Sequence, residues 1–498
     1  MPGLVLAIDQ GTTGTTVLAV RDDGSVAGQA YAAHRQHFPG PGLVEHDASE
    51  IWSNVVQLLG KALDTSGLGY GDVAAIGITN QRETTLVWER SSGELVAPAI
   101  VWQDRRSTAI CRRLAAEGAG DLVTQRSGLV LDPYFSATKL AWIFEESPGL
   151  RRRAEAGELC FGTVDSFLVW QLSGGARHVT DVTNASRTLL MDLERLAYDD
   201  ELCALFGVPP AVLPEIVDSI GEIAETAPGV LPRSGIPVSG ILGDQQAALF
   251  AQGCRRPGQA KNTYGTGSFV LANTGSCRPS TATRLLATAA VAEAGAAAQY
   301  ALEGAIFATG SAVQWLRDGL GIIGAASESE ALAASLASND GVYFVPALAG
   351  LGAPFWDPLA RGTLLGATHG TTRAHLARAV LESIAYRTRD VLEAMGGAGV
   401  PVEELRVDGG ASDNAWLMQF QADVAGIPVD VAAVRETTSL GAAYAAGLGA
   451  GIWDDREELA SLRRSAGVFE PRRSRDEADA LYDRWLEALG RARGWARA

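Results

Sequence analysis

Short apolar runs of strand length alternate along this chain with longer segments whose apolar residues recur at helical spacing. Runs bounded by turn residues predict buried strands at 4–8, 73–79, 236–242 and 405–408. Apolar residues three or four positions apart predict helices at 51–63, 373–395, 414–424 and 474–489. Strands that alternate with helices are typical of α/β proteins, so the pattern predicts that class.

The stretch LVLAIDQGTTGTTV, residues 4–17, joins a buried strand to a turn rich in Gly and Thr. Gly11 and Gly14 permit a tight turn, and successive N–H groups with threonine hydroxyls can surround an anion. Asp9, which ends the strand, is suited to hold Mg²⁺ through water, because magnesium takes one or two carboxylates together with phosphate oxygens. An ordinary Gly/Thr hairpin explains the same residues, and both interpretations stay open at this point. A P-loop is excluded, because no Gly-Lys-Ser/Thr follows.

A second Gly/Thr turn, YGTGSF at residues 264–269, leads into another apolar strand. It repeats the arrangement of the first stretch and predicts two halves of similar architecture, each with a phosphate-binding hairpin at a shared cleft. We place the division at residue 250, with one domain at 1–250 and another at 251–498. The chain has no low-complexity linker, so the halves are expected to be closely joined.

The bulk composition narrows the class of protein. A length of 498 residues is too great for one hydrophobic core and agrees with two large domains. The net charge of −17 argues against nucleic acid and anionic membranes as partners. Five cysteines without a Cys-x-x-Cys pair are typical of reduced thiols. With no signal-like start and no apolar run of membrane-spanning length, we expect a cytoplasmic protein without a membrane anchor.

Further positions carry candidate chemistry, and each has a structural alternative. Arg82 and Glu83 follow a predicted strand and together can grip neighbouring hydroxyls, although a solvated surface ion pair is the simpler explanation. Trp102 and Tyr134 are either core aromatics or the walls of a small polyol pocket. Asp244 stands at a predicted strand-to-helix junction, where it can cap the helix or face the cleft between the halves.

A series of motifs also matches a known family in order along the chain. They are AIDQGTTGTT, PGLVEHD, GITNQRET, VWQDRR, YFSATKLAW, FGTVDSFLVWQL, HVTDVTNASRT, GDQQAALF, NTYGTGSF, PFWD, RGTLLGATHGTTRAHLARAVLESIAYRTRDVL and VDGGASDN. Together they resemble the glycerol kinase branch of the FGGY carbohydrate kinases, over about residues 4–450. NQRE and GDQQ, together with Trp102, are the most specific part of the resemblance.

The resemblance implies an actin-like ATPase fold, in which two α/β domains with ribonuclease-H-like cores flank a deep catalytic cleft. It implies phosphorylation of glycerol to sn-glycerol 3-phosphate, with ATP and Mg²⁺ as cofactors, in glycerol catabolism. The glycerol-binding residues it implies are Arg82, Glu83, Trp102, Tyr134, Asp244, Gln245 and Phe269. The ATP-binding residues it implies are Thr12, Thr13, Gly14, Thr266, Gly310, Gln314, Gly410 and Asn414. Asp244 and Asp9 are the implied catalytic and metal-binding carboxylates, Asp244 as general base and Asp9 as partner of hydrated Mg²⁺.

The chain departs from the family pattern at the first phosphate hairpin. Where the family has two serines and an arginine, this chain has Gly14, Thr15 and Thr16. A positive charge near the nucleotide phosphates is therefore missing, and we expect weaker ATP affinity unless another basic residue replaces it. Residues 222–235 contain no histidine, so the histidine-phosphorylation control of some relatives is expected to be absent.

Two other functions are kept as alternatives. One is an FGGY kinase that acts on a tetritol, pentitol or ketose; the glycerol-type Arg82-Glu83 pair and the bulky Trp102 argue against it. The other is a non-catalytic, actin-like nucleotide-binding scaffold; the presence of Asp9 and Asp244 argues against it. The family suggests a homodimer or homotetramer.

Overall fold

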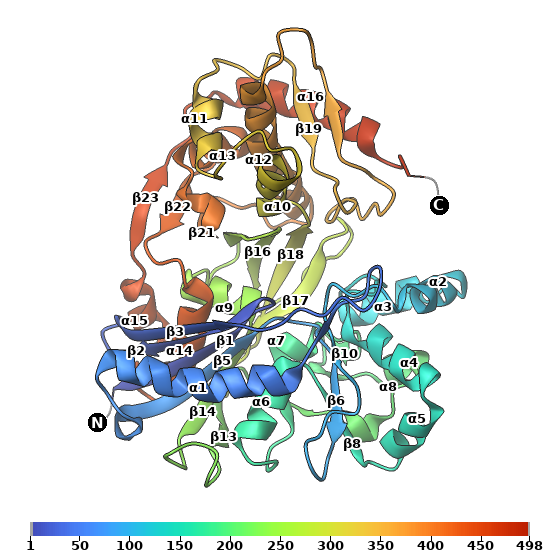
Figure 1. Ribbon diagram of the computed structural model, residues 1–498, viewed down its shortest axis with the longest axis vertical. Helices are drawn as coiled ribbons and strands as arrows, with labels where there is room; N and C mark the ends of the chain where they lie inside the picture. The colour runs from blue at the N-terminus through green and yellow to red at the C-terminus, as the bar shows by residue number, and fades with distance from the viewer. Residues whose placement is uncertain (1–2, 497–498) are drawn as a thin grey trace.

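The computed structural model describes residues 3–496, and two β-sheets form its centre (Figure 1). The strand order of the first sheet is β13 (Ile220–Glu225), β14 (Pro237–Gly243), β5 (Val73–Asn80), β1 (Leu4–Gln10), β2 (Gly14–Val20) and β3 (Val26–Ala33). Strand β1 runs antiparallel to β2 and parallel to β5, and β5 is parallel to β14. The first Gly/Thr turn therefore does close a hairpin, made of β1 and β2.

The second sheet repeats this connectivity. Its order is β17 (Leu286–Val291), β18 (Gln299–Ile306), β16 (Ser268–Gly275), β15 (Gln259–Tyr264), β21 (Glu404–Gly409), β22 (Val429–Ala432) and β23 (Ser465–Phe469). Strand β15 runs antiparallel to β16 and parallel to β21, and β21 is parallel to β22. The similar architecture inferred from the two Gly/Thr turns is thus present in the strand arrangement.

Helices cover both sheets and form a further group beside the first one (Figure 1). The α-helices are α1 (Ala48–Ser66), α2 (Thr108–Ala116), α3 (Gly120–Ser127), α4 (Ser136–Glu146), α5 (Pro148–Glu155), α6 (Val164–Leu172), α7 (Val182–Ala185), α8 (Asp200–Phe206), α9 (Asp244–Ala251), α10 (Gly310–Gln314), α11 (Glu328–Ala334), α12 (Arg373–Gly397), α13 (Ala415–Ala425), α14 (Thr437–Gly449), α15 (Arg456–Leu462) and α16 (Arg475–Ala492). Short strands outside the two sheets are β4 (Glu45–His46), β6 (Leu86–Glu89), β7 (Ala99–Ile100), β8 (Leu159–Gly162), β9 (Val179–Asp181), β10 (Met191–Asp192), β11 (Ala197–Tyr198), β12 (Glu215–Val217), β19 (Tyr343–Val345) and β20 (Thr363–Leu365).

Strand β1 of the first sheet is buried on both faces, which explains its uninterrupted apolar run. Leu6 and Ile8 of β1 pack with α1, whereas Val5 and Ala7, which alternate with them, pack with α14. Helix α14 approaches the sheet closely because Gly77 of β5 has no side chain: a Cβ there would lie 2.1 Å from a carbonyl oxygen of α14. A helix from the last quarter of the chain therefore covers the first sheet.

The second sheet packs on α12, α13 and α16, and the group of α2, α3, α4, α5 and α8 beside the first sheet has an apolar core of its own (Figure 1). The predicted α/β class is confirmed. Within residues 3–496 no helix combines the length and the apolar character needed to cross a bilayer. The division of the chain at residue 250 stays a prediction.

Candidate active site

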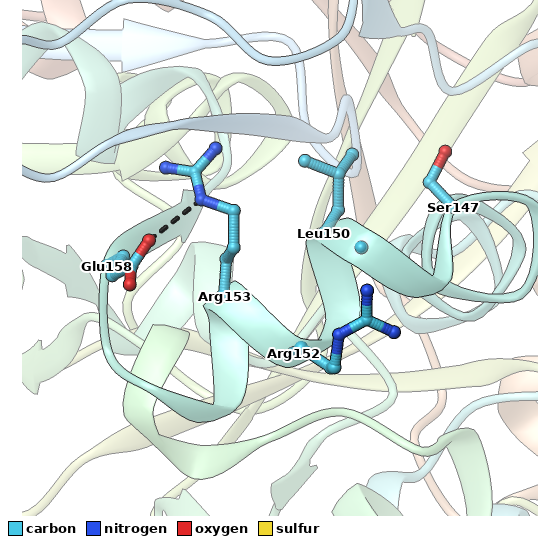
Figure 2. A pocket seen from close by; sticks show the side chains of 6 residues that line it. Ser147, Leu150, Arg152, Arg153 and Glu158 are labelled. Atoms are coloured by element: carbon cyan, nitrogen blue, oxygen red, sulfur yellow. Dashed lines mark hydrogen bonds and ion pairs between the residues drawn. The ribbon is translucent and has the colours of Figure 1, made fainter.

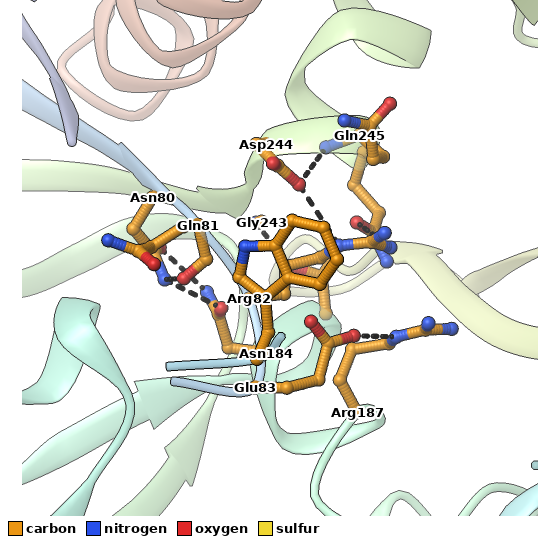
Figure 3. Close-up of polar contacts among 12 residues, drawn as sticks. Asn80, Gln81, Arg82, Glu83, Asn184, Arg187, Gly243, Asp244 and Gln245 are labelled. Carbon is orange, nitrogen blue, oxygen red and sulfur yellow. Dashed lines mark hydrogen bonds and ion pairs between the residues drawn. The ribbon is translucent and has the colours of Figure 1, made fainter. Parts of the chain in front are cut away.

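The carboxyl ends of β1, β5 and β14 carry several predicted site residues, at the edge where open α/β sheets bind ligands. Asp9 lies on β1, Arg82 and Glu83 follow β5, and Asp244 opens α9 directly after β14. Figure 3 shows Arg82, Glu83, Asp244 and Gln245 close together, although they come from distant segments of the chain.

Arg82 lies at the centre of these contacts. Its Nε atom lies 3.0 Å from Oδ1 of Asp244. Gly243 leaves room for this approach, because a Cβ at that position would stand 2.7 Å from Cδ of Arg82. Gly243 is also the N-cap residue of α9, so the carboxylate of Asp244 is directed to Arg82 instead of capping the helix.

Asp244 keeps one carboxylate oxygen available. Its Oδ1 accepts the backbone N–H of Gln245 at 2.7 Å, in addition to the ion pair with Arg82. Within residues 3–496 no hydrogen bond reaches its Oδ2. The side chain is 27% exposed while that of Arg82 is 2% exposed, so Asp244 is the member of the pair that a ligand can reach.

Glu83 has a backbone φ of +61°, in the left-handed region that residues other than glycine seldom occupy. Its Oε1 atom accepts a hydrogen bond from Nε of Arg187 at 2.7 Å. Burial raises the pKa of Glu83, and the charges of Arg187 and Arg82 offset part of that rise. The surface ion-pair alternative is wrong, since Arg82 and Glu83 are both buried and each pairs with other residues. Strained backbone persists mainly at functional sites, which favours a ligand-binding role for Glu83.

Arg187 and Glu303 are two buried charges of this cluster that we did not select from the sequence. Glu303, on β18, accepts hydrogen bonds from Nη1 of Arg82 at 2.5 Å and from Nη2 of Arg187 at 3.0 Å. Burial alone would raise the pKa of Glu303, but the charges of Arg187 and Arg82 outweigh it and hold the pKa at about 2. One signal in the sequence could have identified Glu303: it is a lone carboxylate within the apolar run YALEGAIF. A charge buried in such a run is almost always paired, so the run indicates an unidentified cationic partner.

Three aromatic rings surround this cluster. Trp102 and Tyr134 pack edge to face with ring centroids 5.6 Å apart, and the guanidinium carbon of Arg82 lies 5.8 Å from the ring centroid of Phe269. The three rings are half-buried, so each keeps surface for a ligand. Nε1 of Trp102 donates a hydrogen bond to Oγ1 of Thr12 at 2.9 Å. This bond joins the predicted polyol wall to the first Gly/Thr hairpin.

Gln245 is held by a buried lysine that we also did not select from the sequence. Nζ of Lys261, on β15, donates to Oε1 of Gln245 and, at 2.9 Å, to Oγ1 of Thr263. Burial lowers the pKa of Lys261 to about 8. Because the amide oxygen of Gln245 accepts from this ammonium group, its amide NH₂ is left to donate to another partner.

Some of the residues predicted to bind ATP lie at the two hairpin tips. The first tip, with Thr12 and Thr13, is closed by a hydrogen bond from Gly11 N to the carbonyl oxygen of Gly14 at 2.9 Å. The second tip is closed by a tighter bond, from Gly265 N to the carbonyl oxygen of Gly267 at 2.8 Å, and the N–H of Ser311 donates to the carbonyl oxygen of Thr266 at 3.0 Å. That bond ties the second tip to the start of α10, which begins at Gly310 and ends at Gln314.

Gly410 and Asn414 lie in the turn between β21 and α13. The preceding Gly409 has a φ of +88°, and a Cβ there would stand 2.3 Å from the carbonyl oxygen of Tyr264, so this turn lies against the second hairpin. Oδ1 of Asn414 caps α13 by accepting the N–H of Leu417 at 2.9 Å. Gln314 is exposed, and within residues 3–496 no side-chain hydrogen bond joins it to the other predicted ATP residues.

Asp9 and Asp244 suit a hydrated magnesium ion. The pKa of Asp9 is raised to about 7, chiefly by burial and further by the charges of Asp244 and Glu436, against a hydrogen bond from Ser439 that lowers it. Residues 3–496 contain no group of three His, Cys, Asp or Glu side chains that could hold a metal ion by themselves. Magnesium commonly takes only one or two protein carboxylates, with water and phosphate completing its shell, so two mutually repelling carboxylates fit it.

A hollow of about 680 Å³ beside α5 has different chemistry (Figure 2). Its lining includes Arg152 and Arg153, and Arg153 is already paired with Glu158 at 2.8 Å and with Glu89. None of the residues predicted to bind glycerol or ATP lines it.

Two family models together match most of the chain. The N-terminal domain model of the FGGY family of carbohydrate kinases matches residues 4–251, and the C-terminal domain model matches residues 260–450. The chain therefore belongs to the FGGY family of carbohydrate kinases.

Within that family the chain is similar to glycerol kinases. It is 55% identical to the glycerol kinase of Trichlorobacter lovleyi over 494 residues, with 99% of each chain covered. It is 54% identical to that of Dechloromonas aromatica over 495 residues, with 99% of this chain and 98% of the relative covered. The crystal structure of Plasmodium falciparum glycerol kinase with ADP superimposes with a TM-score of 0.93 at 34% identity, covering 98% of both chains. A ligand-bound xylulose kinase from Lactobacillus acidophilus shares the fold, with a TM-score of 0.88 at 20% identity over 99% of both chains. These matches confirm the resemblance drawn from the motifs and the two-domain α/β fold.

Proposed function

We propose that this chain catalyses the ATP-dependent phosphorylation of glycerol to sn-glycerol 3-phosphate, as a step of glycerol catabolism. The geometric observation that carries the proposal is the hydrogen bond between Trp102 and Thr12, because it brings the predicted polyol wall against the predicted phosphate hairpin. Similarity to glycerol kinases over 99% of the chain supports the same reaction.

In this proposal the polar cluster binds glycerol through its three adjacent hydroxyls. Arg82 donates, Glu83 and Asp244 accept, and the amide NH₂ of Gln245 supplies a further donor. Trp102, Tyr134 and Phe269 cover the carbon atoms, since aromatic faces suit C–H groups. A buried, charge-paired site of this kind penalises a ligand that leaves one of its polar groups without a partner.

ATP is proposed to lie between the two hairpin tips and the turn before α13. Thr12, Thr13 and Gly14 face the phosphates from the first half, and Thr266 faces them from the second. The remaining nucleotide contacts are assigned to Gly310, Gln314, Gly410 and Asn414. When bound through Asp9 and water, beside Asp244, Mg²⁺ supplies positive charge to the phosphate oxygens.

For the chemical step, Oδ2 of Asp244 takes the proton from the primary hydroxyl that attacks the γ-phosphorus in line. The new O–P bond forms as the bond from the γ-phosphorus to the bridging oxygen breaks, and ADP leaves with that oxygen. Arg82 holds the opposite oxygen of this carboxylate at 3.0 Å and so fixes its direction. Phosphoryl transfer asks mainly for positioning and charge neutralisation, so little covalent chemistry falls to the protein. Closure of the halves around the substrates would exclude water and limit hydrolysis of ATP.

The first test is ADP release from MgATP with glycerol, erythritol, xylitol, xylulose or no acceptor. Turnover with glycerol alone is the expected result. Turnover with a longer polyol would keep the reaction class and overturn the substrate. No turnover with any acceptor would favour the scaffold alternative. Sedimentation of the same sample would test the predicted homodimer or homotetramer.

A further inference from the structure

Five charged side chains form a continuous row through the candidate polyol site, in the order Glu83, Arg187, Glu303, Arg82 and Asp244. Each link is a direct contact: 2.7 Å from Glu83 to Arg187, 3.0 Å from Arg187 to Glu303, 2.5 Å from Glu303 to Arg82 and 3.0 Å from Arg82 to Asp244. Figure 3 shows both ends of this charge row, with Glu83 beside Arg187 and Arg82 beside Asp244.

The middle of the charge row comes from the other half of the chain. Glu303 lies on β18 of the second sheet, whereas its two partners follow β5 and α7 of the first half. Glu303 and Arg187 are fully buried at 0% exposure, while Asp244 at the end of the row is 27% exposed. A ligand can therefore reach Asp244 at one end of the row but not Glu303 in its middle, while Glu83 at the other end is 1% exposed.

We propose that Glu303 is a positioning residue for the polyol: it fixes Arg82 directly and Glu83 through Arg187. This inference rests on the proposed function, because it concerns the same glycerol site. Both oxygens of Glu303 are engaged, Oε2 with Nη1 of Arg82 and Oε1 with Nη2 of both arginines. The glycerol site is therefore complete only when the second sheet supplies this carboxylate.

The geometry explains why removal of the negative charge of Glu303 would change the positions of the side chains at both ends of the row. Arg82 also donates from Nη1 to Oε1 of Gln246 at 3.2 Å, so Glu303 and Gln246 together turn its Nε toward Asp244. Glu83 has a left-handed backbone, and its carboxylate is held by Arg187. Without the carboxylate of Glu303, the two guanidinium groups have only the terminal carboxylates as ionic partners, and those are the groups proposed to bind glycerol.

The chain offers a matched control in a remote buried pair. Glu382 of α12 accepts hydrogen bonds from Nε of Arg378 at 2.7 Å and from Nδ2 of Asn339 at 2.7 Å. It is 3% exposed, and neither it nor its partners are among the predicted site residues. Glu382→Gln therefore removes a buried, doubly bonded carboxylate without touching the charge row.

The test compares Glu303→Gln with Glu382→Gln and the wild type in steady-state kinetics. For Glu303→Gln we expect the KM for glycerol to rise about 10- to 100-fold, the range that loss of a charge-assisted hydrogen bond corresponds to. The KM for ATP should stay within about twofold, because the row does not reach the hairpin tips. For Glu382→Gln both KM values should match the wild type, even if both variants melt at lower temperature.

Arg187→Lys gives a second route if Glu303→Gln does not fold. A lysine keeps the charge but lacks the two-armed guanidinium that bonds both carboxylates, so a rise in the KM for glycerol alone is expected again. The inference is overturned if the folded variants keep the wild-type KM for glycerol, or if both KM values rise in parallel. A wild-type protein without glycerol-dependent ADP release would instead overturn the proposed function, and the two failures are therefore distinguishable.

Discussion

The two sheets share their strand connectivity but differ in chemistry at matching positions. In the first sheet Asp9 of β1 pairs with Thr79 of the neighbouring parallel strand β5. In the second sheet Thr263 of β15 pairs with Asp408 of β21. The carboxylate and the threonine have thus exchanged strands between two otherwise similar frameworks.

The partners of these two carboxylates differ as well. Asp408 accepts hydrogen bonds from Nε2 of Gln252 and Oγ1 of Thr437, both at 2.8 Å and both to Oδ2. Within residues 3–496 Asp9 accepts one hydrogen bond, from Oγ of Ser439 at 2.9 Å, and its pKa is raised to about 7, first of all by burial. A carboxylate with two donors is satisfied within the protein, whereas a half-buried carboxylate with a single donor is suited to a cation. The same fold therefore supports a structural carboxylate on one sheet and a candidate ligand-binding one on the other.

The largest expected effect is at Asp244, which belongs to the first half alone. Asp244→Asn should lower kcat by about a thousandfold, because general base catalysis is typically worth 10²–10⁴-fold. The fold should persist, since the amide can still accept from Gln245. Steady-state kinetics with a melting curve would check this, and near-wild-type turnover in a folded variant would remove Asp244 from the role of base.

Asp9 and Asp408 test the comparison of the sheets directly. Asp9→Asn should lower kcat by about a hundredfold and raise the Mg²⁺ concentration needed for half-maximal rate, because magnesium would lose its carboxylate partner. Asp408→Asn is the matched control and should change kcat by less than about fivefold, with its main effect on stability. Magnesium titrations of both variants would measure this. Equal losses of activity in the two variants would contradict the hypothesis that Asp9 binds magnesium while Asp408 has only a structural role.

A smaller effect is expected at Thr16, the position where the family has arginine. Thr16 lies directly opposite Asp9 in the β1–β2 pair, so both side chains point to the same face of the sheet. Thr16→Arg should lower the KM for ATP by about threefold, because it restores a positive charge near the phosphates at a partly exposed position. The KM for glycerol serves as the internal control. An unchanged KM for ATP would mean that the missing arginine has no influence on affinity.

The smallest effect concerns one buried lysine in each half. Burial lowers the pKa values of Lys139 and Lys261 to about 8, so each lysine resists protonation in the folded state. Between pH 8 and about pH 10.4 the unfolded chain therefore binds more protons than the folded protein. The contribution of Lys139 to the free energy of unfolding rises with pH over this range and is lost as pH falls through 8. Urea unfolding at pH 7 to 10 would check this: the free energy of unfolding of the wild type should rise with pH relative to that of Lys139→Met. Lys61→Met, at an exposed position of α1, should show a constant difference.

Much of this arrangement could be predicted from sequence because the signals are local. The run before Asp9, the two Gly/Thr turns and the helical spacing of α1, α12 and α16 each occupy a continuous segment, and the structure has those elements at those places. The family motifs assigned Arg82, Glu83, Trp102 and Asp244 to one site. In the structure Arg82, Glu83 and Asp244 lie in one cluster.

The residues we did not select depend on contacts between distant segments. Glu303 is 221 positions from Arg82 and lies in an apolar strand whose pattern indicates only burial. Lys261 is buried against Gln245, and a lysine at the start of a strand gives no sign of that. The partner of a buried charge is decided by packing of the two sheets, which no local pattern contains.

Helix α14 has a consequence for how the chain folds during synthesis. Val5, Ala7, Leu18 and Val20 of the first sheet bury their side chains against Leu440, Tyr444 and neighbouring residues. Until the ribosome has released those late residues, one face of the first hairpin is packed against α1 and the other, apolar face is exposed to water. We therefore expect a nascent chain of about 250 residues to be prone to aggregation, because this apolar face stays uncovered until α14 has been synthesised.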